Sequence, residues 1–525
     1  MSRRQCTSSP PDEKDTTDEH ETTGAAVGQA PAGQLAEADM SGPKLRLDRR
    51  RFLGLLAPAV AAPELSRSLL AAKESTSGKV PNFVIILCDN LGYGDIGCFG
   101  SKRNRTPSID RMAAEGMRLT SFYVTSGVCT PSRASLMTSC YPRRNNMHAS
   151  ASGKLVLDAI DRKGLHPDEI TIAEVLKGQG YATACIGKWH LGDQPSFLPT
   201  RQGFDSYLGI PYSDDMVATP DGSRPPLPLM RNEKVIEAPV DRNTLTKRYT
   251  EETIRFITSN RDKPFFVYLP HAMPGSTAES FASETFRGKS ANGTYGDAVE
   301  ELDWSTGEIL AALRKLGLDD RTVVVWTSDN GSPNRRYGSN APLSGWGYTT
   351  AEGGMRVPCV MRWPRKIPTG RTCDELTTTM DLMPTFARLA GTNPPGDRII
   401  DGKDIWPLMA GEVGAKSPHE AFYFYHVADL QAVRSGKWKL CLPRVLNRRE
   451  QKELGVEKMP MTLYDLEADI GETKNVASDH PEVVKRLLAL AEKAREDLGD
   501  GQRQGKNQRP AGFVESPKPQ ILSGE

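Results

Sequence analysis

Neither sign of charge prevails in this sequence, because 67 lysine and arginine residues face 66 aspartate and glutamate residues. A formal charge of +1 gives no indication of a nucleic-acid or anionic-membrane partner. The nine cysteines are scattered and lack the paired spacing of zinc ribbons, and we assume no disulfide framework. No internal repeat is visible. With 38% hydrophobic and 25% charged residues, the composition is that of a globular protein with a substantial polar surface.

A hydrophobic run long enough to anchor the chain permanently in a membrane is also missing. Residues 1–45 are polar, have no hydrophobic period and are predicted to be disordered. Residues 46–78 contain Arg49-Arg50-Arg51-Phe52-Leu53 and a short apolar stretch interrupted by prolines, which resembles a twin-arginine export signal. The alternative is a basic amphipathic segment of the folded protein. We expect export to the periplasm or the outside, and Met40 offers an alternative start of translation.

Continuous apolar runs alternate with helical patterns through the middle of the chain. Each run predicts a strand buried on both faces: 83–88, 181–186, 265–269 and 322–327, with a further strand at 117–124. Helical spacing is present at 107–115, 168–177, 245–260, 295–316 and 382–389. This alternation predicts an α/β fold, a large, mostly parallel or mixed sheet sandwiched by helices, over 79–410.

The pattern changes near residue 410. Shorter strand-like segments follow at 421–425, 431–433, 438–442 and 463–466, and a helical pattern closes the region at 482–498. We predict a smaller C-terminal domain over 411–499, with an antiparallel sheet and a closing helix. Residues 500–525 are rich in Gly, Pro and Gln and are predicted to be an irregular tail.

The most specific run in the chain is Cys129-Thr130-Pro131-Ser132-Arg133, which reads as a loop leading into a helix. The backbone N–H groups of such a helix start are suited to hold an anion. A buried structural cysteine is the alternative. The run resembles the signature of the type I sulfatases of the alkaline phosphatase superfamily. In that family this cysteine is oxidised to Cα-formylglycine, the catalytic aldehyde, which implies the same role for Cys129.

Two Asp-Asn pairs follow predicted buried strands. Asp89-Asn90 comes after the first strand and Asp329-Asn330 after the strand at 322–327. Ligands gather at the carboxyl ends of strands in open α/β sheets, and four oxygen donors suit a hard cation. Each pair alone could be a helix cap or a turn. The resemblance implies that together they form the sulfatase metal site, holding Ca²⁺ or alternatively Mg²⁺, although Asn90 stands where the family usually has a second Asp.

The resemblance extends from about residue 81 to 499 and implies further site residues. Lys188 and His190 match the pair behind the formylglycine, and Ser213 matches a hydroxyl that contacts sulfate. In the implied mechanism the metal, Arg133 and Lys188 neutralise the sulfate, a hydroxyl of the hydrated aldehyde attacks sulfur, and His190 is the base that allows sulfate to leave.

Two positions depart from the family. Gly275 stands where a His usually protonates the leaving group, and Gly347 stands where a Lys usually binds sulfate. These losses favour impaired protonation of the leaving group unless another residue supplies it. His271, which we assign to substrate binding, and Lys289 are the two candidates for this substitution.

The leading hypothesis is an exported hydrolase of an aryl or carbohydrate sulfate, with a sulfated small molecule or glycan as substrate. Its partners would be a formylglycine-generating maturation enzyme and the export machinery, and no nucleic acid is expected. One alternative is a phosphoester or phosphonate-ester hydrolase with the same formylglycine. Another is a catalytically weakened, sulfatase-like protein that binds glycans, motivated by Asn90, Gly275 and Gly347.

Overall fold

A computed structural model describes residues 80–333, 337–446, 448, 451–452 and 455–522. The chain divides into two units, 1–74 and 75–525, and everything below concerns the second. The predicted disordered segment 1–45 and the predicted signal and linker at 46–78 lie outside the described residues. In the part of the chain that is described, no helix has the length and apolar character needed to cross a bilayer.

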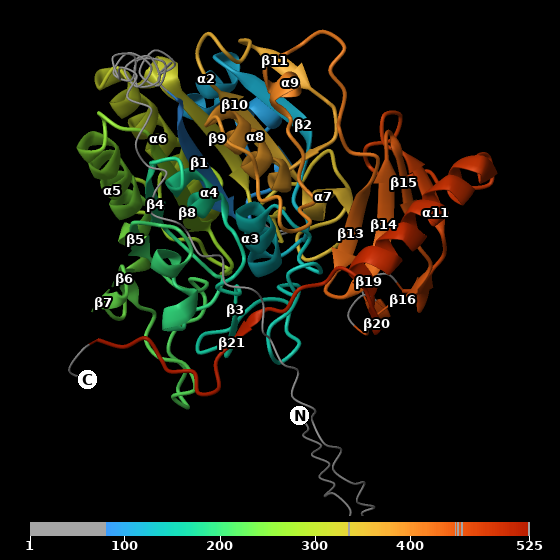
Figure 1. Cartoon of the computed structure of the whole chain (residues 1–525), viewed down its shortest axis with the longest axis horizontal. Helices are drawn as coiled ribbons and strands as arrows, with labels where there is room; N and C mark the ends of the chain where they lie inside the picture. Colours follow the sequence, from blue (N-terminus) through green and yellow to red (C-terminus); the bar gives the residue numbers. More distant parts are fainter. Residues whose placement is uncertain (1–79, 334–336, 447, 449–450, 453–454, 523–525) are drawn as a thin grey trace, which may run out of the picture. The chain divides into compact units, whose positions relative to one another are not determined.

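The large sheet has eleven strands within the described residues, in the order β11-β2-β10-β9-β1-β8-β4-β5-β6-β7, with β12 beside β2 (Figure 1). Its centre is parallel and comprises β9 (Thr322–Ser328), β1 (Asn82–Asp89), β8 (Phe265–Pro274), β4 (Ala182–Ile186) and β5 (Ser206–Gly209). The edges are mixed: β2 (Met117–Tyr123), β10 (Arg356–Arg362), β6 (Leu229–Arg231), β7 (Lys234–Glu237), β11 (Arg371–Cys373) and β12 (Thr377–Thr378). The predicted α/β fold with a mostly parallel or mixed sheet is confirmed.

Helices cover both faces of this sheet (Figure 1). Alternate residues of β1 face opposite sides: Phe83, Ile85 and Leu87 join one hydrophobic core, and Val84 and Ile86 join the other. The first core contains residues of α3 (Cys129–Thr138), α4 (Ile172–Lys177) and α8 (Leu382–Leu389). The second contains residues of α2 (Pro107–Ala114), α5 (Leu245–Ser259) and α6 (Gly293–Lys315).

Six strands of this sheet were not predicted from the sequence: β5, β6, β7, β10, β11 and β12. β5 is only four residues long, too short to give a clear strand pattern. β10 contains Pro358, which interrupts the strand signal because proline has no N–H to donate. The pairing of β10 with β2 shifts register between Val357 and Cys359, so the irregularity lies at this proline.

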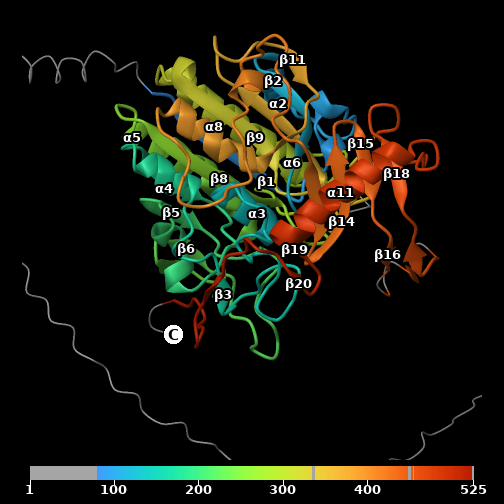
Figure 2. The same cartoon turned by 45° about the vertical axis from the view of Figure 1, so that its right-hand side comes forward.

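A second, antiparallel sheet follows in the order β13 (Phe422–His426), β14 (Asp429–Ser435), β15 (Trp438–Cys441) and β18 (Thr462–Asp465). α11 (Pro481–Leu498) lies across it, as predicted for a closing helix (Figure 2). The remaining short elements are α7 (Glu352–Met355), α9 (Trp406–Met409), β3 (Lys163–Gly164), β16 (Arg444–Val445), β17 (Lys458–Met459), β19 (Gly499–Asp500), β20 (Arg503–Gln504) and β21 (Gly512–Phe513). The tail returns to the large sheet's domain, where β21 pairs with β3.

Buried charges connect the two sheets. Glu352 of α7 is fully buried and accepts hydrogen bonds from Lys439 Nζ of β15 (3.0 Å) and Arg356 Nη1 (3.3 Å). The Tyr123 hydroxyl also donates to Glu352 and accepts from Arg434 of β14. Burial alone would raise the pKa of Glu352, but Lys439 and Arg356 outweigh it and lower that pKa to about 2. An ionised carboxylate therefore joins the C-terminal sheet to the large sheet.

Glu352→Gln should lower the free energy of unfolding by about 3 kcal/mol at neutral pH, because Lys439 and Arg356 lose a buried anionic partner. Lys439 keeps its second partner, Glu472, at 2.8 Å. The wild type keeps this contribution above the ordinary glutamate pKa of about 4.3 and loses it as the pH falls toward about 2. Denaturant unfolding of the wild type and the variant at several pH values measures the difference in their free energies of unfolding, which should become smaller as the pH falls. The matched control Glu467→Gln, at an exposed carboxylate, should change stability by less than about 0.5 kcal/mol. A Glu352→Gln variant as stable as the wild type would contradict the conclusion that an ionised Glu352 joins the two sheets.

Candidate active site

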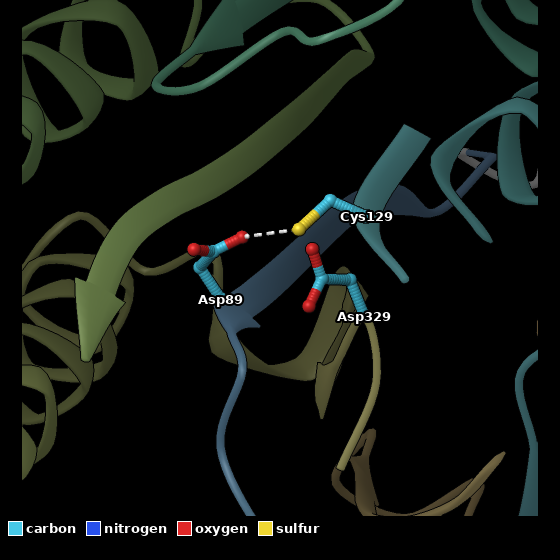
Figure 3. Close-up of side chains that lie close together, drawn as sticks. All are labelled: Asp89, Cys129 and Asp329. Atoms are coloured by element: carbon cyan, nitrogen blue, oxygen red, sulfur yellow. Dashed lines mark hydrogen bonds between the residues drawn. The ribbon is translucent and has the colours of Figure 1, made fainter. Parts of the chain in front are cut away.

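Three side chains from different elements meet at the carboxyl edge of the large sheet (Figure 3). Asp89 ends β1, and Asp329 directly follows β9, the parallel neighbour of β1. Cys129 is the first residue of α3, and its thiol donates to Asp89 Oδ1 at 3.4 Å. One atom from each of the three residues lies within 4.8 Å of the others. The strand-end argument and the Cys129 run therefore lead to the same place.

Arg133 connects the two carboxylates. It lies one turn after Cys129 on α3 and is fully buried. Its Nη2 is 2.9 Å from Asp89 Oδ1 and 2.8 Å from Asp329 Oδ2, and its Nε donates to the same Asp329 oxygen at 2.9 Å. Nη1 donates to the backbone carbonyl of Lys188 at 2.6 Å. The guanidinium thus fixes two strand ends and the loop after β4 relative to one another.

Lys188 brings a second buried cation to the same carboxylate. Its Nζ lies 2.7 Å from Asp89 Oδ1, 3.0 Å from Ser213 Oγ and 3.5 Å from Cys129 Sγ. Burial would lower the pKa of Lys188, but the charge of Asp89 outweighs it and raises that pKa, so the amine is cationic. Lys188, Ser213 and Cys129 are brought together as the sequence predicted.

The two carboxyl groups differ in their pKa. Burial would raise the pKa of Asp89, but Lys188 and Arg133 together lower it to about 2. The pKa of Asp329 rises to about 6, first through burial and then through the like charge of Asp89, against the effect of Arg133. A further positive charge at this edge would favour ionisation of both groups.

The amides of Asn90 and Asn330 complete a set of oxygen donors. Asn330 Nδ2 donates to Asn90 Oδ1 at 2.5 Å, and the Asn90 backbone N–H donates to Asp329 Oδ1 at 3.0 Å. Asn330 Oδ1 is buried and has no hydrogen-bond partner among the described residues. A buried acceptor without a donor, beside two carboxylates, fits a hard cation that takes oxygen ligands.

His190 is held with one ring nitrogen available. A carbonyl can only accept, so Nε2 carries the proton and donates to the Leu157 carbonyl at 2.9 Å. Nδ1 is buried and lacks a partner among the described residues. Burial, followed by the charge of Lys188, lowers the pKa of His190 well below its ordinary value. The ring is therefore neutral, and Nδ1 is free to accept a proton.

His271 is not brought to this group. β8 continues to Pro274, five residues beyond the predicted strand, so His271 lies inside the strand and not after its end. Its Nε2 is 3.3 Å from Ser305 Oγ of α6, and its ring packs near Tyr249 of α5. Within the described residues it makes no hydrogen bond to the site's side chains. Lys289 is exposed and donates to the Thr285 carbonyl.

The sequence analysis missed two neighbours of the site. Ser276 Oγ accepts from Asn90 Nδ2 at 2.9 Å and lies 3.4 Å from Ser213 Oγ. Tyr348 has a left-handed backbone (φ 70°), and its N–H donates to the carbonyl of Gly127, two residues before Cys129. Each follows a glycine at which the resemblance fails, and this adjacency is the only signal in the sequence that pointed to them.

The comparisons with known proteins agree with one another. A family model described as Sulfatase matches residues 81–392, and one described as N-sulphoglucosamine sulphohydrolase, C-terminal, matches residues 348–497. Steryl-sulfatase of Mus musculus is 38% identical over 465 residues, which cover 73% of this chain and 74% of that protein. Arylsulfatase A of Homo sapiens is 37% identical over 467 residues, which cover 81% of this chain and 90% of that protein.

A solved structure gives the same result. The crystal structure of Ps i-CgsB superposes with a TM-score of 0.69 at 28% identity, over 82% of this chain and 95% of that one. The first family model spans more than half of the chain, and the relatives named here are sulfatases, which does not favour the phosphoester alternative. The chain belongs to the sulfatase family, whose members hydrolyse sulfate esters.

Proposed function

We propose that the protein hydrolyses an aryl or carbohydrate sulfate to alcohol and sulfate, through a formylglycine made from Cys129 and a bound divalent cation. The observation that carries this proposal is the meeting of Asp89, Asp329 and Lys188 around the Cys129 thiol. No other described cluster of His, Cys, Asp and Glu side chains has metal-ligand geometry.

The proposed cation is Ca²⁺, with Mg²⁺ as the alternative. Four side chains are the candidate ligands: Asp89, Asn90, Asp329 and Asn330. Carboxylate and amide groups coordinate metals through oxygen, which favours a hard cation over zinc. Bound there, a divalent cation would supply positive charge to the sulfate and to the nucleophile. Asn90 contributes one negative charge fewer than a second aspartate would, which predicts weaker binding.

The side chains around Cys129 have distinct proposed tasks. A formylglycine at this position would supply, as its hydrate, the hydroxyl that attacks sulfur. Lys188 Nζ lies 3.5 Å from Cys129 Sγ and 3.0 Å from Ser213 Oγ, which supports a role for both side chains in binding sulfate oxygens. Arg133 keeps the carboxylates in place, and neutral His190 accepts a proton at Nδ1.

The substrate proposal is a sulfated glycan or a sulfated small molecule. Ps i-CgsB has been solved in complex with k-i-k-neocarrahexaose, and two relatives carry the names steryl-sulfatase and N-acetylgalactosamine-6-sulfatase. The different substrates in these names support a class of substrate and not one compound. Export by the twin-arginine route from residues 46–78, and oxidation of Cys129 by a maturation enzyme, belong to the same proposal. So do the domain limits 79–410, 411–499 and 500–525.

Cys129→Ala should reduce turnover of an aryl sulfate by on the order of 10⁴-fold or more, because it removes the precursor of the nucleophile. The protein should still fold, since the thiol makes a long hydrogen bond at a helix start. Turnover of nitrocatechol sulfate, with mass spectrometry of the Cys129 peptide after co-expression of a maturation enzyme, measures both effects. Cys373→Ala, at a half-buried cysteine of β11, is the control and should keep activity. An unmodified thiol in an active wild type would refute the assignment.

Asn90→Asp should tighten Ca²⁺ binding by about 1–2 kcal/mol, because a charged ligand replaces a neutral one. Asp329→Ala should abolish binding. Calorimetric titration of the unmodified protein with Ca²⁺ tests both variants without any need for turnover. Asp262→Asn, at a side chain that is 93% exposed, is the control and should leave the titration unchanged. Equal affinity of wild type and Asn90→Asp would mean that Asn90 is not a ligand.

A further inference from the structure

The backbone at Gly275 lies close against the Asp214 carboxyl group and the Ala272 carbonyl. Gly275 follows β8, has φ 88°, and its N–H donates to the carbonyl of Asp89 at 3.1 Å. A Cβ added there would lie 3.1 Å from Asp214 Oδ2 and 3.3 Å from Asp214 Oδ1. The Asp214 carboxyl group therefore faces the space that a side chain at position 275 would enter.

Asp214 has few donors for a fully buried carboxyl group. Its Oδ2 has no hydrogen-bond partner among the described residues, and its Oδ1 accepts only a long bond from the Ser276 N–H at 3.5 Å. Burial without donors disfavours the charged form and favours a neutral acid. The residue also adjoins the sulfate-binding region, because it directly follows Ser213, whose Oγ accepts from Lys188.

We propose that Asp214 is the general acid that protonates the leaving-group oxygen, in the place of the side chain missing at Gly275. This inference rests on the proposed sulfatase function. As sulfur bonds to the nucleophile at position 129, the bond between sulfur and the leaving oxygen breaks and its electron pair stays on that oxygen. The Asp214 proton moves to this oxygen, the alcohol departs, and solvent returns a proton to the carboxylate.

The charges around Asp214 set the pH range in which it can act. Burial, then the negative charges of Asp89 and Asp215, raise its pKa to about 7, against the effects of Lys188 and Arg242. Tyr249 of α5 is a further titratable group that interacts with it: burial raises the pKa of Tyr249, and the charge of Asp214 adds a smaller contribution. A general acid must be protonated, so its contribution is present below about pH 7 and is lost as the pH rises further.

Tyr348 is the rival donor. It is half-buried, and its phenol interacts with Ser276. Burial raises the pKa of Tyr348, so it stays protonated near neutral pH but is a weaker acid than Asp214. It also cannot produce a loss of activity near pH 7. The two residues therefore predict different pH profiles.

The test uses the mature, Ca²⁺-loaded enzyme and a series of aryl and alkyl sulfates whose leaving alcohols rise in pKa. Asp214→Asn should reduce turnover of the most basic leaving groups by about 10²–10⁴-fold and that of nitrophenyl sulfate far less. It should also remove the fall in rate above about pH 7. Infrared difference spectra give a readout without turnover. Near neutral pH, the wild type should show a protonated-carboxyl band that Asp214→Asn lacks, in addition to a band from buried Asp95, whose pKa is also about 7 and which both proteins share.

Asp215→Asn is the matched comparison at the exposed next residue: it should keep the leaving-group dependence and move the fall in rate to lower pH, because the charge of Asp215 helps to raise the pKa of Asp214. An equal loss for all leaving groups in Asp214→Asn, or a steeper dependence in Tyr348→Phe instead, would overturn the proposal. A wild type that turns over no sulfate ester would contradict the proposed function itself. If Asp214→Asn does not fold, the same series of sulfates is measured with the wild type below and above about pH 7. A dependence of turnover on leaving-group pKa that is steeper above about pH 7 supports Asp214, and an equal dependence at both pH values contradicts it.

Discussion

The bridge from Arg133 to Asp89 and Asp329 is the interaction on which the rest of the site depends. Removing one partner from a buried ion pair costs about 3–5 kcal/mol, because the remaining charge is stranded. Together with Lys188, these four fully or almost fully buried groups sum to no net charge when both carboxylates are ionised. Adding the proposed divalent cation makes the site positive by two. That excess is what a sulfate ester requires, since negative charge grows on its oxygens in the transition state.

The large sheet explains why this group of charges could be predicted. Parallel strands end at the same edge, so Asp89 and Asp329 were expected to meet although 240 positions separate them. Cys129 and Arg133 were recognisable because their run is specific, and Lys188 and Ser213 from the same resemblance. The local sequence was informative for Asp89, Asp329 and Cys129 because each lies at a strand end or a helix start.

Contacts between loops could not be read in the same way. The bond between Asn90 and Asn330, the position of Ser276 and the orientation of Asp214 depend on how separate loops pass one another. His271 was assigned wrongly because β8 is longer than predicted. Side chains alternate between the two faces of a strand, and the His271 ring lies on the face toward Ser305 and not toward the site. β10 was missed for a local reason, since Pro358 interrupts its apolar pattern.

The C-terminal sheet also shapes the site, through the loop that carries Tyr348. Lys439 Nζ of β15 donates to the Thr350 carbonyl at 3.0 Å as well as to Glu352, and Thr350 Oγ1 donates to Gln431 of β14 at 2.8 Å. The Tyr348 N–H in turn holds the segment that leads to Cys129. A sheet without any proposed ligand therefore fixes the loop in which the family's sulfate-binding lysine is absent.

The departures from the family pattern are neighbours in space, and their chemistry is mutually consistent. Asn90 donates to Ser276 Oγ, which a carboxylate at that position could not do, and Ser276 follows the glycine that Asp214 faces. A second aspartate at position 90 would also add negative charge near Asp214 and raise its pKa further, which would weaken it as an acid. With an amide at position 90, the proposed proton donor keeps a pKa near the pH at which general acids are most effective. In this proposal, the amide at position 90 and the glycine at position 275 belong to one rearranged proton-transfer site.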